Sequence, residues 1–107
     1  MAGDAVPGGG RGVTFYLFAR FQARAGMEDA VMAAMNAIMA PSRAEPGCLE
    51  IGAYRSLRDP RLFFVHSRWT DEIAFDRHAA LPHTLRFIAE MERLTDAMEV
   101  SRSERLA

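Results

Sequence analysis

The sequence contains a single cysteine, Cys48, so it can form neither an internal disulfide nor a cysteine-rich metal cluster. Chains without disulfides are typical of reducing compartments, and we therefore expect a cytoplasmic location. Cys48 begins an apolar segment, where small buried cysteines are common and chemically inert. We interpret it as a structural residue rather than as a nucleophile.

Long apolar runs and a surplus of one charge are also missing. No run approaches the roughly 18 residues of a membrane-spanning helix, and residues 1–12 lack the apolar centre of a signal peptide. The formal net charge is −1, with acidic and basic residues interspersed. Because a nucleic-acid-binding domain needs a basic stripe, we expect neither nucleic acid nor a membrane as a partner.

The chain does have enough apolar material for one core. Its 107 residues fit a single domain, and half of them are hydrophobic. Residues 1–12 are rich in glycine and predict a flexible tail, so residues 13–107 form the expected folded domain. The glycines of this tail follow no strand and precede no Gly-Lys-Ser or Gly-Lys-Thr, which argues against a phosphate-binding loop.

Hydrophobic periodicity predicts an order of strand, helix, strand, strand, helical region and strand. Pro41 is expected to end or kink the first helix, and Thr70 to cap the second helical region. This order predicts an α+β fold of the ferredoxin-like β-α-β-β-α-β type with an antiparallel sheet. The predicted strands cover residues 13–22, 48–57, 62–69 and 97–102, and the predicted helical segments cover residues 28–40, 71–81 and 82–94.

The first predicted strand is apolar on both of its faces. Phe15, Leu17 and Phe21 lie on one face, and Tyr16 and Phe18 lie on the other, because side chains alternate in a strand. Helices can cover one face of the sheet, but a large apolar patch on the other face needs a second cover. A partner sheet is the natural candidate, so we expect a homodimer.

The chain also carries a set of short segments in a definite order. They are Ala25-Gly26-Met27-Glu28, Ser42-Arg43-Ala44-Glu45-Pro46-Gly47-Cys48-Leu49, Arg68-Trp69-Thr70-Asp71, Ala74-Phe75-Asp76 with His78, and Pro82-His83. In this order and spacing they resemble the antibiotic biosynthesis monooxygenase family, especially its quinol-monooxygenase branch. The resemblance covers about residues 13–100; none of the segments is unique to the family, but their combined order is specific.

This resemblance implies a dimeric α+β barrel, in which two antiparallel sheets pack face to face with the helices outside. It also implies a pocket between the sheet and the helices. The implied function is a cofactor-independent monooxygenase, which uses molecular oxygen on a quinol, phenolic or polycyclic aromatic substrate without metal or flavin. Family members often carry a glutamate two residues before the tryptophan, whereas this chain has Ser67 there and lacks that acid or base.

Histidines are the candidate catalytic residues. Removing a proton from a hydroquinone leaves an anion that can reduce oxygen, and a general base with a pKa near neutrality suits this step. His78 is the first candidate, because it lies on the apolar side of its helix at a family-like position, and His83 is the second. Either could instead be an ordinary core or surface histidine. His66 is expected to point the opposite way, into the dimer barrel.

The candidate substrate-binding residues form an apolar enclosure around these histidines. Trp69 could stack on a substrate or anchor the core, and Tyr54 and Arg20 could bind a phenolate or stand at the rim. His78 and His83 do not have a metal-ligand spacing, so we expect neither a metal nor another cofactor. The substrate-binding set consists of Leu17, Phe21, Val65, Ser67, Trp69 and Phe87.

Two alternative functions remain open at this stage. The first is a non-catalytic dimeric-barrel module that binds an aromatic ligand, which the serine at position 67 favours. The second is haem degradation, known among relatives of the family. The asparagine and the iron-ligating histidine of those enzymes fall at Ala19 and near Ile88 in this chain, so haem degradation has less support.

Overall fold

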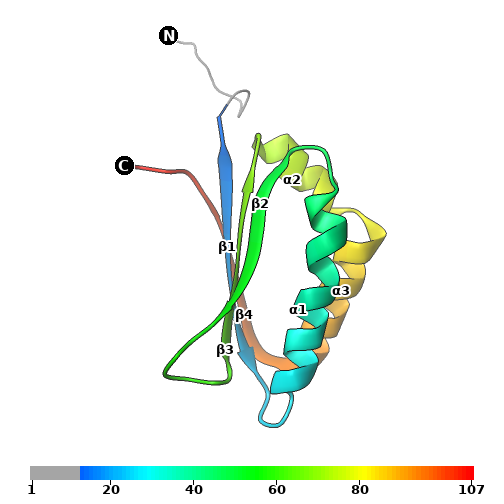
Figure 1. Cartoon of the computed structure of the whole chain (residues 1–107), viewed down its shortest axis with the longest axis vertical. Coiled ribbons are helices and arrows are strands. Elements are labelled where there is room, and N and C mark those ends of the chain that lie inside the picture. Colours follow the sequence, from blue (N-terminus) through cyan, green and yellow to red (C-terminus); the bar gives the residue numbers. More distant parts are fainter. Residues whose placement is uncertain (1–12) are drawn as a thin grey trace.

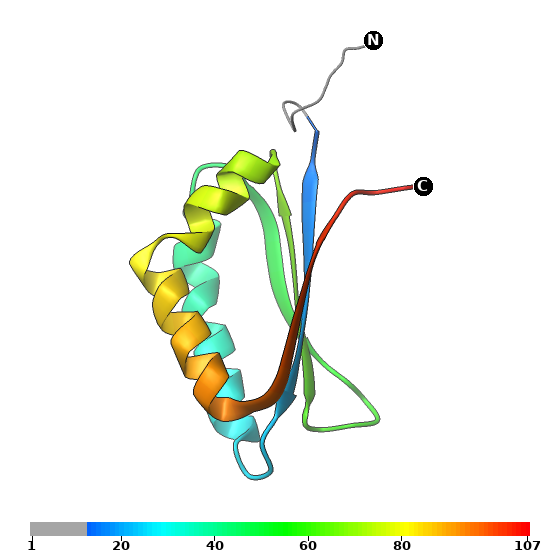
Figure 2. The same cartoon turned by 180° about the vertical axis from the view of Figure 1, so that it is seen from behind.

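The computed structural model describes residues 13–107, and the tail predicted for residues 1–12 lies outside the described residues. Within this part of the chain, four strands form one antiparallel sheet in the order β2-β3-β1-β4, and three helices pack on one of its faces (Figures 1 and 2). The predicted ferredoxin-like α+β fold is therefore confirmed. Its elements are β1 (Phe15–Ala23), α1 (Glu28–Arg43), β2 (Cys48–Arg55), β3 (Leu62–Trp69), α2 (Glu72–Ala79), α3 (Pro82–Leu94) and β4 (Thr95–Ser103).

Several element boundaries differ from the prediction, and β1 begins at Phe15 instead of residue 13 while β2 ends at Arg55 instead of residue 57. Helix α1 continues through Pro41 to Arg43, since a proline so close to the helix end removes only one amide donor from the last turn. Helix α2 is capped by Asp71 instead of Thr70, because the Asp71 carboxylate accepts a hydrogen bond from the Ala74 amide at 2.8 Å. Strand β4 covers Thr95–Ser103 and is longer than the predicted residues 97–102.

The core lies between the sheet and the helices. Strand β1 sends Phe15, Leu17 and Phe21 to this side, and each is at most 8% exposed. The register places Leu17 opposite Ser67 and Phe21 opposite Phe63 on β3, so both central strands present one continuous apolar face. The helices close this face with residues at helical spacing, among them Val31, Met35 and Ile38 of α1 and Met91 and Leu94 of α3. None of the helices within residues 13–107 has the length and apolarity needed to span a membrane.

No helix of residues 13–107 lies on the opposite face of the sheet, as the two views show (Figures 1 and 2). Phe18 and Tyr54 on this open face are 51% and 52% exposed. The His66 ring lies 4.9 Å from the ring of Phe18 and 6.3 Å from that of Tyr16, measured between centroids. The open face is therefore aromatic, as the apolar pattern on both sides of β1 predicts.

A charged contact links the C-terminal strand to helix α2. The Arg102 guanidinium of β4 lies 2.7 Å from a Glu72 carboxylate oxygen and 2.8 Å from an Asp76 carboxylate oxygen. The same guanidinium lies over the rings of Phe15 and Phe75, at 5.8 and 5.1 Å from their centroids. Helix α2 is thus held against the sheet both by its buried face and by β4.

Candidate active site

A cavity of about 120 Å³ lies between the sheet and the helices. Its wall is largely apolar and contains Leu17, Phe21, Val65, Ser67 and Phe87 of the predicted substrate-binding set. The polar side chains that line it are those of Ser67, His78 and Thr84. Val100 of the edge strand β4 also lines the cavity and is 51% exposed, which places one side of the cavity near the sheet edge.

His78 projects from α2 into this enclosure. His78 is 6% exposed, and its ring packs on the rings of Trp69 and Phe75 with centroid separations of 4.7 and 5.5 Å. The ring nitrogen Nδ1 lies 2.8 Å from Glu45 Oε2, and the Thr84 hydroxyl lies 3.3 Å from the same nitrogen. Burial lowers the pKa of His78 below its usual range, although the hydrogen bond and charge of Glu45 act in the opposite direction. A lowered pKa favours the uncharged form of the His78 imidazole at neutral pH.

The other ring nitrogen of His78, Nε2, has no hydrogen-bond partner among the described residues. It is also not a sealed atom, because Ser42 Oγ is the buried side-chain polar atom of residues 13–107 that lacks a partner. Nε2 is therefore at least partly accessible, and the His78 residue itself lines the cavity. A neutral imidazole whose Nδ1 carries the proton has its lone pair on Nε2, so this atom can accept a proton.

Glu45 reaches His78 because of a tight turn between α1 and β2. The Glu45 amide donates to the Ser42 carbonyl at 3.1 Å, and the Cys48 amide donates to the Glu45 carbonyl at 3.2 Å. Gly47 between them has a φ of +90°, and a Cβ atom there would lie 2.6 Å from Ala74 Cβ on α2. Glycine therefore lets the turn sit directly against α2, the helix that carries His78.

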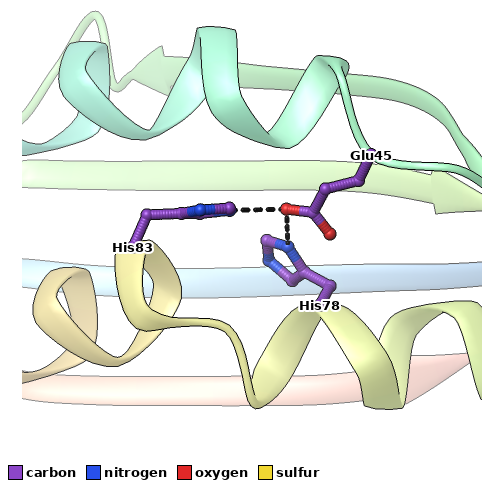
Figure 3. A group of neighbouring side chains, drawn as sticks. All are labelled: Glu45, His78 and His83. Carbon is purple, nitrogen blue, oxygen red and sulfur yellow. Dashed lines mark hydrogen bonds and ion pairs between the residues drawn. The ribbon is translucent and has the colours of Figure 1, made fainter.

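His83 approaches the same carboxylate from the first turn of α3. Its Nε2 lies 2.6 Å from Glu45 Oε2, so both histidines contact one oxygen atom (Figure 3). The Glu45 side chain is 9% exposed and the His83 side chain 23%. His83 does not line the cavity; it lines a groove between α1 and α3 together with Ala33, Ala37 and Arg86. The second candidate base thus lies behind Glu45, away from the cavity surface.

Trp69 is also placed differently from the prediction that it borders the cavity. It is completely buried and does not line the cavity, because Phe75 and His78 cover it. Its indole Nε1–H donates to Ser67 Oγ at 2.9 Å, and this hydroxyl does line the cavity. Trp69 therefore supports the wall from behind, and Ser67 stands between it and the enclosed space.

Three residues considered from the sequence lie on the open face of the sheet. The β1–β3 register pairs Phe18 with His66 and Arg20 with Phe64, and the β2–β3 register pairs Tyr54 with Phe64. Side chains at these positions point away from the helices, since their neighbours along each strand point toward them. His66, Arg20 and Tyr54 therefore do not reach the cavity.

The carboxylate and the two histidines also form a group with metal-ligand chemistry. Their ligand atoms all lie within 4.8 Å of one another. In a tetrahedral zinc site, however, ligand atoms about 2.0–2.2 Å from the metal stand roughly 3.3 Å apart. The distances of 2.8 and 2.6 Å from Glu45 Oε2 to the two nitrogens are hydrogen-bond distances, so this arrangement fits protons between the groups better than a cation.

Cys48 follows the same turn and is half-buried. Burial raises the pKa of the Cys48 thiol, and the nearby Glu45 charge adds to this effect. A thiol with a raised pKa forms little of the nucleophilic thiolate, which supports the structural interpretation of this residue.

Comparison with known proteins agrees with this geometry. The model of the family described as antibiotic biosynthesis monooxygenase matches residues 14–90. The chain belongs to this family. The match includes β1, α1 and the turn with Glu45, as well as β3, α2 and most of α3, so it covers Glu45, both histidines and the cavity residues other than Val100. Membership of the antibiotic biosynthesis monooxygenase family supports a monooxygenase-like function.

Individual relatives share this fold closely. Rv0793 of Mycobacterium tuberculosis, for which a monooxygenase activity has been proposed, is 33% identical over 78 residues, covering 73% of this chain and 76% of that protein. Its solved structure has a TM-score of 0.83 at 28% identity and covers 88% of this chain and 96% of its own. The crystal structure of PA3566 from Pseudomonas aeruginosa has a TM-score of 0.83 at 33% identity. The match covers 92% of this chain and 100% of the PA3566 chain.

Like Thr84, Glu45 is a site residue that the sequence patterns do not reveal. It belongs to one of the segments that carry the family resemblance, but it was interpreted only as part of a turn. Its partners His78 and His83 lie 33 and 38 residues further along the chain. The signal that could have marked Glu45 is its place directly before Pro46-Gly47, in the turn that leads into an apolar strand.

Proposed function

We propose that this protein is a cofactor-independent monooxygenase that oxidises a quinol or phenol with molecular oxygen, with His78 as its general base. The observation that carries the proposal is that His78 lines a largely apolar cavity and that its Nε2 atom has no hydrogen-bond partner within residues 13–107. Proton abstraction would convert a bound hydroquinone into an electron-rich anion. The apolar wall would limit water around that anion and protect it from side reactions.

Such a reaction is balanced without an external reductant. A hydroquinone and one molecule of oxygen give a hydroxylated quinone and water. The substrate supplies all four electrons that oxygen takes up, since its ring is hydroxylated at one carbon and oxidised to a quinone. His78 would hold the first proton at Nε2 until it is returned to the oxygen that leaves as water.

The cavity size favours a small substrate. An engineered apolar cavity of about 150 Å³ binds benzene, and the cavity here has about 120 Å³. We therefore propose a single-ring substrate rather than a polycyclic one. Haem is not proposed, because its macrocycle exceeds this volume and because Ala19 and Ile88, which line the cavity, cannot ligate iron.

Oxygen uptake with a panel of single-ring hydroquinones tests this function. We expect uptake by the wild-type protein without added metal or flavin, and we expect it to persist after treatment with a chelator. A hydroxylated quinone should appear in equal amount to the oxygen consumed. If no hydroquinone in the panel increases uptake above its spontaneous oxidation, the proposal is wrong.

The binding-module alternative is supported by one observation at the same cavity. Ser67 stands where family members often carry glutamate, and its hydroxyl accepts from Trp69, so it offers no acid or base. Trp69 packs on His78, so ligand entry should change its fluorescence. Saturable fluorescence changes with phenols, without oxygen uptake for any of them, would support a binding module instead of an enzyme.

We also propose that the protein works as a homodimer whose open sheet faces pack against each other. The support is the aromatic character of that face, where Phe18 and Tyr54 are half-exposed and Tyr16 and His66 stack. Exposed apolar patches of this kind mark interaction surfaces. Such a dimer leaves the cavities on the helix-covered side of each sheet, so each protomer would carry a complete site.

A further inference from the structure

We propose that Glu45 is a positioning residue of this site, which orients His78 and fixes the tautomer that leaves its Nε2 lone pair facing the cavity. The inference rests on the proposed function for its catalytic consequence. Its structural part, the tautomer of His78, stands independently of any substrate. His83 has a supporting role in this arrangement, because it binds Glu45 and not the cavity.

The tautomer follows from which groups can donate. An ionised carboxylate accepts hydrogen bonds and cannot donate them. Because His78 Nδ1 lies 2.8 Å from Glu45 Oε2, the proton of the neutral ring belongs on Nδ1. The lone pair then belongs to Nε2, the nitrogen without a protein partner. In the other tautomer, two acceptors would face each other across 2.8 Å and Nε2 would be blocked by its own hydrogen.

Glu45 also compensates the charge that proton abstraction creates. When Nε2 takes a proton from the substrate, His78 becomes an imidazolium in a place where it is 6% exposed. A buried unpaired charge is costly, but the Glu45 carboxylate then forms a charge-assisted hydrogen bond with Nδ1. The substrate O–H bond breaks, the Nε2–H bond forms, and the net charge of the Glu45–His78 pair rises from −1 to zero.

His83 keeps the carboxylate in this position from the outside. Its Nε2–H donates to the same Glu45 oxygen at 2.6 Å, so Oε2 is bound by one donor from α2 and one from α3 (Figure 3). Ile38 and Phe87 line both the cavity and the outer groove that contains His83. They form the wall between the two spaces, and the Glu45 carboxylate joins His78, which lines the cavity, to His83, which lines the groove.

Nitrogen NMR of the ligand-free protein tests the structural part directly. With ¹⁵N-labelled histidine, we expect the wild-type His78 ring to be protonated at Nδ1 and unprotonated at Nε2 at neutral pH. Glu45→Leu removes the acceptor, and we expect the Nδ1–H preference of His78 to disappear while the His66 signals stay unchanged. A wild-type His78 ring protonated at Nε2 would overturn the inference, whether or not the protein consumes oxygen.

Kinetics with Glu45→Gln separate the charge from the hydrogen bond, because glutamine keeps an acceptor oxygen without the charge. We expect kcat for a hydroquinone to fall at least about tenfold with KM little changed. The acid limb of the pH profile should move to lower pH, since the Glu45 charge no longer favours protonated His78. Glu92→Gln, at an exposed position of α3, is the matched control and should behave as the wild type.

The outcomes distinguish this inference from the proposed function. No oxygen uptake by the wild-type protein would contradict the proposed function, and the NMR result would still decide the tautomer. Equal kcat and an unchanged pH profile in folded Glu45→Gln would overturn the catalytic part of the inference while leaving His78 as the base. A third variant, His83→Gln, should lower kcat less than Glu45→Leu, because its amide can still donate to the carboxylate.

Discussion

The two faces of the sheet differ although the same strands build both. On β3, Phe63 points to the helices and is 1% exposed, whereas its neighbour Phe64 points to the open face and is half-buried. On β1, Leu17 and Phe18 show the same contrast. The helix-covered face has the cavity and the buried histidine, and the open face has stacked aromatic side chains. The difference teaches that alternation along one strand can give a sheet one face that encloses a cavity and another that exposes aromatic side chains.

The largest expected difference between the two faces is in the free energy of unfolding of variants at two adjacent phenylalanines, Phe63 and Phe64. Phe63→Ala leaves a hole in the closed core and should lower the free energy of unfolding by about 3–5 kcal/mol. Phe64→Ala should cost less, and its cost should depend on protein concentration if the open face is a dimer interface. Urea unfolding at several protein concentrations measures both. If both variants lost the same free energy of unfolding, and if neither loss depended on protein concentration, the two faces would not differ as we propose.

The next largest expected difference is in the turnover of variants at His78 and His66, which lie on opposite faces of the sheet. His78→Ala should lower turnover of a hydroquinone at least about a hundredfold, or about 2.7 kcal/mol of transition-state stabilisation. His66→Ala should change turnover much less, because His66 does not reach the cavity. Oxygen uptake across pH is the measurement, with His78→Gln as a second variant of closer size. Near-normal uptake by either folded His78 variant would exclude this residue as the base.

A charge on the open face should break the proposed dimer. Phe18→Glu would place a carboxylate between the two sheets, and we expect the dimer dissociation constant to rise at least about tenfold, or about 1.4 kcal/mol. Leu57→Glu is the control, because Leu57 is fully exposed in the β2–β3 loop. Sedimentation over a range of concentrations compares them. A wild-type monomer at micromolar concentration would contradict the dimer itself.

The smallest expected effect is on the pH dependence of the free energy of unfolding, and it comes from His78 on the helix-covered face. Because the pKa of His78 is lowered in the folded protein, the unfolded chain binds the proton more readily. Stability should therefore fall as pH drops below the ordinary histidine value of 6.5, by at most about 1.4 kcal/mol per pH unit for this one proton. His78→Gln should flatten this slope, whereas His66→Gln should retain it. Thermal melts between pH 7.5 and 5.5 compare the variants.

The fold was predictable from the sequence because its signals are local. Alternation in β1 and the helical spacing of Val31, Met35 and Ile38 each depend on neighbours a few residues away. Boundaries were less predictable, since Thr70 and Asp71 both suit a helix cap and only the chain geometry selects Asp71. Pro41 was overestimated as a helix end for a similar reason: the packing of α1 on the sheet outweighs one missing amide.

The site was predictable only in part. The sheet-facing position of His78 followed from its helix face, and the cavity residues Leu17, Phe21, Val65 and Ser67 followed from strand alternation. Glu45 could not be found in this way, because its contact with His78 depends on how α1, α2 and the intervening turn pack together. The same packing puts His83 behind that carboxylate, which no spacing between the two histidines reveals.

The contact of Arg102 with Glu72 and Asp76 has a practical consequence for anyone who measures this protein. Helix α2 carries His78, yet part of what holds it is a pair of surface ion pairs whose side chains are about half-exposed. Such pairs contribute only about 0.2–1 kcal/mol each, and added salt weakens them. Rates of different variants are therefore comparable only when they are measured at one ionic strength, and a tag attached at the C-terminus would follow directly on the strand that contacts helix α2.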